Sequence, residues 1–192
     1  MLVNFDELPE TSKVWIFQAS RSLTDQEQEE IKSKIEVFIN NWTSHGSDLQ
    51  ASYLLKYKRF IILALNSELN KATGCSIDAS VHFIQGLEKE YDVDLLDKMN
   101  VSYKQGEFIA YKSLTDFRQM AKDKAVSKNT IVFNNHVNNK AEFLKKHKER
   151  VSLIGLVFAF LLFIVGGIYL QKANQREKAP LAVVSSSKIE LV

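Results

Sequence analysis

The chain has 192 residues and carries 25 lysines and arginines against 23 aspartates and glutamates, a formal charge of +2. Eight of the basic and three of the acidic residues lie from Lys145 onward, so the rest of the chain has 17 basic and 20 acidic residues. This net charge of 17 − 20 = −3 disfavours nucleic-acid binding, which uses a basic face. The single cysteine, Cys75, excludes an internal disulfide and fits a reducing compartment.

The first part of the chain predicts a strand and then a helix. Residues 1–13 show no apolar periodicity, so a flexible leader is expected there. The apolar run of residues 14–17 predicts a buried strand. Thr24 and Glu27 then match a capping box, which opens a helix that Gly46 is expected to end. Its apolar residues recur on one helical face. They are Ile31, Ile35, Phe38, Ile39 and Trp42.

Two strands are predicted next, over residues 49–57 and 59–66. The uninterrupted apolar run of residues 60–65 suits a central strand, which is buried on both faces. A polar loop follows at residues 67–74. Apolar residues at helical spacing then begin a second helix near Ile77.

A hairpin, a helix and a strand complete the predicted domain. Residues 99–103 and 108–112 flank a glycine-containing turn, a helix is expected from Ser113, and residues 130–133 form a short strand. Strand pairs placed between single helices favour antiparallel pairing. The fold class predicted for residues 14–143 is therefore α+β, with a mixed or mainly antiparallel sheet and about three helices on one side.

An uncharged stretch of 20 residues, VSLIGLVFAFLLFIVGGIYL, follows at residues 151–170. A helix of this length spans about 30 Å, the thickness of the hydrocarbon core of a bilayer. A single transmembrane helix is therefore predicted, in preference to a buried core helix, which is usually shorter. Residues 171–192 form a short tail after it.

The flanks of this stretch predict its orientation. The start of the chain lacks the pattern of a secretory signal, so export of the large N-terminal domain is not expected. Four basic residues precede the span and three follow it, a bias that places the N-terminal side in the cytoplasm. We therefore expect a single-pass protein of the inner membrane with a cytoplasmic domain. Its juxtamembrane segment, 144–150, is expected to contact anionic lipid through Lys145, Lys146, Lys148 and Arg150.

Cys75, together with Asp78, is the one candidate for catalytic chemistry. The N-terminus of the second helix favours a thiolate there, whereas the carboxylate of Asp78 opposes it. His82 lies about 10 Å further along the helix axis, too far to act as a base. We therefore favour a structural role, in which Ser76 or Asp78 caps the helix and Cys75 fills a small apolar gap. A thiol-dependent enzyme or redox sensor is the alternative.

Other chemistry-bearing patterns are not found in the sequence. The four histidines are scattered, with no pair at the spacing of a helical metal face, so no metal site and no cofactor are predicted. No segment matches the phosphate-binding pattern GxxxxGK[ST], which excludes an ATPase of the P-loop kind. Enzymatic activity is accordingly not predicted.

Several segments resemble an uncharacterised family of small Bacteroidetes proteins that often carry the label "ABC transporter ATPase". These segments are VWIFQASRSLTDQEQEEI, GCSIDASVHFIQGLEKEYDVDLLD, SLTDFRQ and NTIVFNNHV. The resemblance covers about residues 13–143, and the GCSID segment is its most specific part. It implies a bacterial cytoplasmic α+β domain and, through the label, an accessory subunit of a membrane transporter. It supplies no catalytic residues, and the added transmembrane helix departs from the family pattern.

Together these features predict a non-enzymatic cytoplasmic domain that is tethered to the inner membrane. Its expected partners are membrane lipid and a protein or small ligand near the membrane. The thiol-dependent enzyme and the transporter subunit are the two alternatives.

Overall fold

The structure, a computed structural model, describes residues 1–150 apart from residues 45, 70–72 and 147. These residues belong to one compact unit, Met1–Leu153. The predicted membrane span at 151–170 and the tail at 171–192 lie outside the described residues. Among the helices that are described, none combines the length and the apolar character that crossing a bilayer requires.

The described chain is α+β, with antiparallel sheets and four α-helices. The predicted class is therefore confirmed, while the expected number of helices is one too small. The first sheet has the order β1-β5-β4 and is antiparallel throughout. Its strands are β1 (Lys13–Gln18), β5 (Phe60–Leu65) and β4 (Ala51–Lys56). Every residue of the central strand β5 is buried, as its apolar run predicts.

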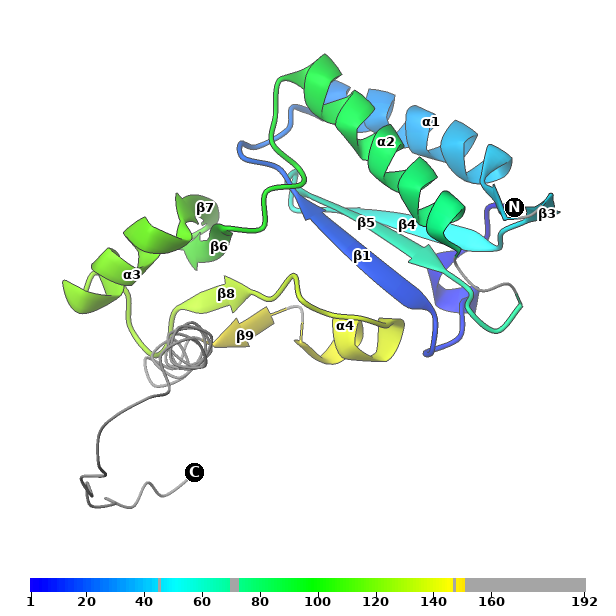
Figure 1. Ribbon diagram of the computed structural model, residues 1–192. Helices are drawn as coiled ribbons and strands as arrows, with labels where there is room; N and C mark the ends of the chain where they lie inside the picture. Colours follow the sequence, from blue (N-terminus) through cyan, green and yellow to red (C-terminus); the bar gives the residue numbers. More distant parts are fainter. Residues whose placement is uncertain (45, 70–72, 147, 151–192) are drawn as a thin grey trace, which may run out of the picture. The chain divides into compact units, whose positions relative to one another are not determined.

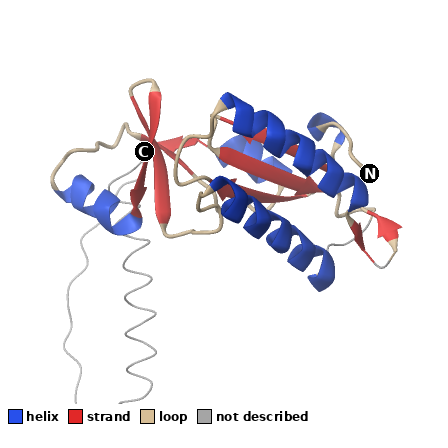
Figure 2. Ribbon diagram, turned by 90° about the horizontal axis from the view of Figure 1, so that it is seen from above, coloured by secondary structure: helices blue, strands red, loops and turns tan. Residues whose placement is uncertain are grey.

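Two long helices, α1 (Asp25–Asn41) and α2 (Gly74–Tyr91), cover one face of this sheet (Figures 1 and 2). The predicted capping box opens α1: the N–H of Glu27 donates to the Thr24 hydroxyl at 3.1 Å, and the N–H of Thr24 donates to the Glu27 carboxylate at 2.7 Å. The second helix begins at Gly74 instead of near Ile77, because Thr73 caps it in a second box.

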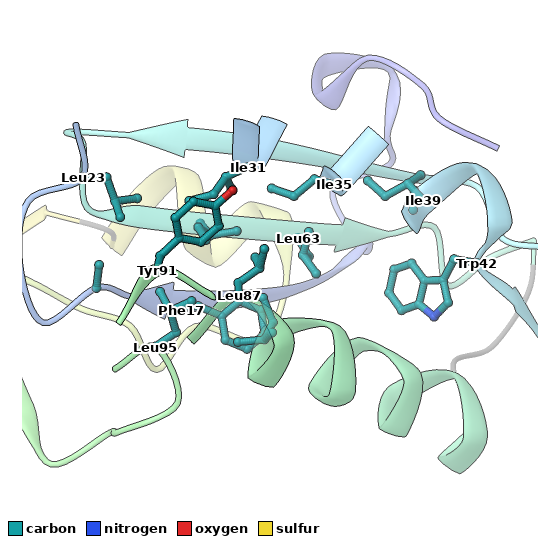
Figure 3. Packing of buried hydrophobic residues seen from close by; sticks show 14 of the residues in the cluster. Phe17, Leu23, Ile31, Ile35, Ile39, Trp42, Leu63, Leu87, Tyr91 and Leu95 are labelled. Carbon is teal, nitrogen blue, oxygen red and sulfur yellow. The ribbon is translucent and has the colours of Figure 1, made fainter. Parts of the chain in front are cut away.

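The main core lies between these helices and the sheet (Figure 3). Three isoleucines of α1 point toward Leu63 of β5, and side chains of α2 meet them from the other side. These side chains are Ile31, Ile35 and Ile39 of α1 with Leu87 and Tyr91 of α2. Burying each isoleucine or leucine of this set contributes about 1.5–3 kcal/mol. This core holds the sheet rigid against the helices.

A second core lies on the opposite face of the same sheet. The predicted flexible leader contributes to it, since η1 (Phe5–Glu7) buries Phe5 and the chain then buries Leu8, at 5% and 3% exposure. Phe133, Val137 and Phe143 join them from the C-terminal part of the unit. A 3₁₀ turn of three residues has no detectable period, so the sequence did not predict it.

A separate antiparallel sheet has the order β7-β6-β8-β9. Its strands are β6 (Asn100–Gln105), β7 (Phe108–Ser113), β8 (Ile131–Phe133) and β9 (Lys148–Arg150), and α3 (Leu114–Lys122) follows β7. A short hairpin of β2 (Thr43–Ser44) and β3 (Ser47–Asp48) follows α1.

The fourth helix, α4 (Lys140–Lys146), was not predicted. The expected juxtamembrane segment, 144–150, falls on the end of α4 and on β9. Lys145 is exposed there, and the side chains of the other three predicted lipid-contacting residues lie outside the described part.

Candidate functional site

The turn between β4 and β5 has an unusual backbone. Tyr57 and Lys58 have φ of 57° and 52°, the left-handed region that a type I′ hairpin turn needs and that Asn-Gly normally fills. Non-glycine residues held in sparsely populated regions cost about 1–3 kcal/mol each and cluster at functional sites. Neighbouring backbone holds the turn, since the N–H of Leu23 donates to the carbonyl of Lys58 at 2.7 Å.

Arg59, the next residue, is a buried cation with only 7% of its surface exposed. Its Nη1 donates to the carbonyl of Ala19 at 2.8 Å, and its Nη2 donates to the carbonyl of Ile109 at 3.4 Å. The guanidinium carbon lies 5.7 Å from the ring centre of Tyr111. Within the described residues no carboxylate forms an ion pair with Arg59. The charge therefore meets only neutral dipoles and an aromatic face.

Burial acts on the ionisation of both members of this pair. Desolvation lowers the pKa of Arg59, and the neighbouring Tyr111 partly offsets this effect. Desolvation also raises the pKa of Tyr111 to about 12, with Asp97 and Asp94 adding to the rise. At neutral pH the phenol is thus uncharged and the guanidinium is charged, because arginine keeps its proton in proteins.

Aromatic rings pack at tilted angles beside the turn and join the two sheets. The ring centres of Tyr57 and Phe133 are 5.3 Å apart, and those of Phe60 and Phe133 are 5.0 Å apart. Phe133 belongs to β8 of the second sheet, whereas Tyr57 and Phe60 flank Arg59 on the first. Edge and tilted contacts of this kind add about 0.5–1.5 kcal/mol beyond burial. They fix one wall of the space in front of Arg59.

A hollow of about 520 Å³ opens at this place, and we call it the Arg59 pocket. Its lining combines aromatic and aliphatic groups with charged ones. The lining residues are Ser22, Tyr57, Lys58, Arg59, Lys104, Glu107, Phe108, Ile109, Ile131 and Phe133. The lining has three cations and one carboxylate, and one of the cations, Lys58, is paired with Asp25 of α1 at 2.5 Å. Phe108, at 80% exposure, is an apolar side chain that the described chain leaves largely uncovered.

These features suit the binding of an organic anion. A guanidinium has five N–H donors in a planar fork that fits carboxylate and phosphate. The described residues use two of these nitrogens, Nη1 and Nη2, for backbone carbonyls. Apolar walls with a few convergent polar groups are typical of small-molecule sites of about 300–1,000 Å³.

Cys75 and Asp78, the predicted catalytic candidates, lie elsewhere. Arg59 directly precedes β5, whereas the loop before α2 follows the other end of that strand. Cys75 therefore lies at the opposite end of the sheet from Arg59, about 20 Å away, the length of the strand. Its thiol is exposed, so the expectation that Cys75 fills an apolar gap is wrong. Thr73 is the N-cap residue, and Ser76 completes the capping box by accepting from the N–H of Thr73 at 2.9 Å, so Ser76 takes part in the cap as expected while Thr73 stands in place of Asp78. His82 is exposed on the same helix.

The structure brings no metal-binding set together within its described residues. Sequence reasoning also missed Arg59, which it treated as the first residue of a strand. One signal was available: the turn sequence Tyr57-Lys58-Arg59 stands between two apolar runs without glycine, asparagine or proline. A hairpin without the usual turn residues indicates a backbone held in place by tertiary contacts.

Comparison with protein-family models, curated proteins and solved structures finds no match to the chain. The resemblance to the Bacteroidetes family therefore stays a prediction.

Proposed function

We propose that this chain is a membrane-tethered cytoplasmic domain that binds a small organic anion in the Arg59 pocket. The anionic group is a carboxylate or a phosphate, and an apolar or aromatic body carries it. The domain acts by binding, without a reaction of its own, near the inner membrane.

The observation that supports this proposal is the burial of Arg59 without a carboxylate. Removing a cation from water costs several kcal/mol after relaxation, and hydrogen bonds to charged groups return about 1.5–3 kcal/mol each. The bond from Arg59 to Ile109 is long, at 3.4 Å, and so returns little. An anion in the pocket would supply the missing counter-charge and use the remaining donors.

The lining supports an organic body on that anion. Phe133 and Ile131 come from β8, and Phe108 and Ile109 come from β7, so apolar groups surround the charged end of the pocket. Lys104 adds a second cation at the rim, where it is exposed. A ligand of about 100–200 Å² of apolar surface would gain hydrophobic free energy there in addition to the ion pair.

The tether rests on sequence alone. The uncharged stretch at 151–170 has the length of a membrane helix, and the basic segment before it suits the lipid surface. A ligand site on the tethered domain would sample the cytoplasm directly beneath the bilayer.

The test is ligand titration of the full chain in a mild non-ionic detergent. Phenyl phosphate and benzoate are the probes, benzamide is the neutral control of the same shape, and calorimetry measures affinity. We expect saturable binding of an anionic probe at least about tenfold tighter than that of benzamide, because only the anion pairs with Arg59. Equal affinity of benzoate, phenyl phosphate and benzamide would exclude an anion site.

Two variants locate the binding. Arg59→Met should weaken the anionic probe by at least about tenfold, while the matched exposed substitution Lys89→Met on α2 should change affinity by less than about twofold. Lys104→Met, at the rim, should weaken the affinity for the anionic probe by about threefold. It is the variant that tests the pocket if Arg59→Met does not fold. Unchanged affinity in both pocket variants would place the binding elsewhere and overturn the proposal.

A further inference from the structure

The strand β4 is an edge of the first sheet, and most of its outer side is open. Among the described strands, the order β1-β5-β4 leaves one side of β4 without a strand partner. The first residues of the chain cover its beginning: Ala51 donates to the carbonyl of Met1 at 3.1 Å and accepts from the N–H of Val3 at 3.0 Å. The chain then turns into η1 and leaves the strand.

The alternation of the ladder shows which groups beyond Ala51 face outward. Because the N–H and C=O of Ala51 point away from β5, those of Tyr53 and Leu55 point the same way. In the part of the chain that the structure describes, no backbone group pairs with Tyr53 or Leu55 on this side. Two outward N–H groups and two outward carbonyls are thus available in a row.

The opposite edge of the sheet is treated differently. On β1, the N–H of Val14 donates to the carbonyl of Asn138 at 3.3 Å, and Lys13 forms a bridge with Asn139. Natural proteins cover, bend or charge their sheet edges to prevent unwanted pairing. Among the described residues, Ile16 and Gln18 of β1 also face outward without a backbone partner, but they are buried, at 5% and 4% exposure, whereas Tyr53 and Leu55 of β4 are half-buried and therefore more accessible.

The open edge lies in a groove of about 760 Å³. Residues 52–55 of β4 line it together with residues 2–5 and with a row of side chains from α1. These α1 residues are Asp25, Gln28, Glu29, Lys32 and Glu36. Tyr53, Leu54 and Leu55 are half-buried, so the groove exposes both backbone and apolar side-chain surface.

The charge of the α1 row selects the kind of occupant. The row holds three carboxylates and one lysine, and Asp25 is already paired with Lys58 of the β4–β5 turn at 2.5 Å, which leaves a net charge of −1 along Glu29, Lys32 and Glu36. The Tyr53 hydroxyl donates to the Glu36 carboxylate at 2.5 Å, which places that charge directly over the strand. A second copy of this chain, pairing edge to edge, would bring its own acidic row into the site and be repelled. A basic segment would be attracted.

From this geometry we infer that β4 accepts an extended segment of a partner protein, rich in lysine or arginine, as an added strand. Its backbone pairs with the N–H and C=O groups of Tyr53 and Leu55. Its basic side chains lie along α1, against Glu29 and Glu36. This mode of strand addition takes affinity from main-chain hydrogen bonds and specificity from the flanking side chains. It is independent of the Arg59 pocket.

The experiment measures binding of labelled peptides to the full chain in detergent by fluorescence anisotropy. The probe is a peptide of about nine residues in which lysine and valine alternate, long enough to cover the open edge. One control replaces lysine by glutamate. The other keeps the lysines and carries N-methyl groups on alternate backbone nitrogens, which removes the donors that a strand needs.

We expect the basic peptide to bind at least about tenfold tighter than either control. Binding should slow hydrogen exchange at the amides of Tyr53 and Leu55 by at least about tenfold. Equal binding of the N-methylated peptide would show attraction by charge alone, and unchanged exchange at both amides would place the peptide elsewhere. Either result, or an absence of saturable binding, overturns the inference.

Variants test the two parts of the site separately. Glu29→Lys should weaken the affinity for the basic peptide by at least about fivefold. The matched charge reversal Glu10→Lys, outside the groove, should change this affinity by less than about twofold. Leu55→Pro removes an outward N–H at an edge position that tolerates proline and should weaken binding by about tenfold. Equal effects of Glu29→Lys and Glu10→Lys would contradict a local site.

Discussion

Replacing Arg59 by methionine tests whether its charge is kept for binding or for stability. The variant loses the bonds to the carbonyls of Ala19 and Ile109, at 2.8 and 3.4 Å. The shorter one contributes about 1.5–3 kcal/mol and the longer one much less. The variant also avoids the desolvation penalty of a buried cation, which is several kcal/mol and opposes folding in the wild type. Methionine keeps most of the apolar packing of the arginine stem.

These two effects nearly cancel in the absence of a ligand. We therefore expect the free energy of unfolding of Arg59→Met to lie within about 1 kcal/mol of the wild-type value. Urea unfolding of the full chain in detergent gives this quantity, with tryptophan fluorescence as the signal. Trp42 is 2% exposed, and its ring centre lies 6.1 Å from that of Trp15, so the fluorescence reports on the main core.

A loss of about 3 kcal/mol or more would refute this reasoning. It would mean that Arg59 joins the first sheet to β7 as a structural link, since removing one partner of a buried network has a cost of that size. Adding phenyl phosphate provides a second comparison. It should raise the unfolding midpoint of the wild type and leave that of Arg59→Met unchanged, because only a bound ligand adds stability.

Three further predictions concern the turn, the capping box and the tether. Lys58→Gly should be at least as stable as the wild type in urea unfolding, because glycine adopts the left-handed backbone conformation without the steric cost of about 1–2 kcal/mol that lysine has there. Lys56→Gly, within β4, should lose about 1 kcal/mol of stability. The pKa of Glu27 is lowered to about 2, first by the hydrogen bond from Arg21. The stability that Glu27 contributes to the folded state is therefore complete above its unfolded pKa of about 4.5 and is lost as the pH falls toward 2. Glu27→Gln should accordingly flatten the loss of stability between about pH 4.5 and pH 2, and an unchanged acid limb in a pH series of urea midpoints would contradict this. Deleting residues 151–170 should move the protein from the membrane pellet to the supernatant in detergent-free fractionation, and a wild-type chain already in the supernatant would exclude the tether.

Local patterns in the sequence predicted the first sheet and its helices well. The run of residues 60–65 is the buried central strand, and Thr24 with Glu27 is the capping box of α1. Both features are determined by residues close together in the sequence, so a local pattern or motif predicts them. The hairpin of β6 and β7 follows the same logic, since Gly106 takes the turn with a φ of 61°.

Features that depend on distant contacts could not be predicted in this way. The pairing of β8 with β9, and the burial of Phe5 against Phe143 with ring centres 5.7 Å apart, join remote parts of the chain. The candidate site belongs to this group. Arg59 is an ordinary basic residue in the sequence, and only the approach of Ile109 and Phe133 from another sheet makes it a buried, unpaired charge.

The pairing of β8 with β9 links the pocket to the point where the predicted anchor starts. Ile131 and Phe133, which line the pocket, pair along β8 with Arg150 and Lys148 of β9. Arg150 directly precedes residue 151 in the chain. A ligand bound in the pocket would therefore contact β8, whose partner strand β9 leads directly into the residues where the anchor is predicted.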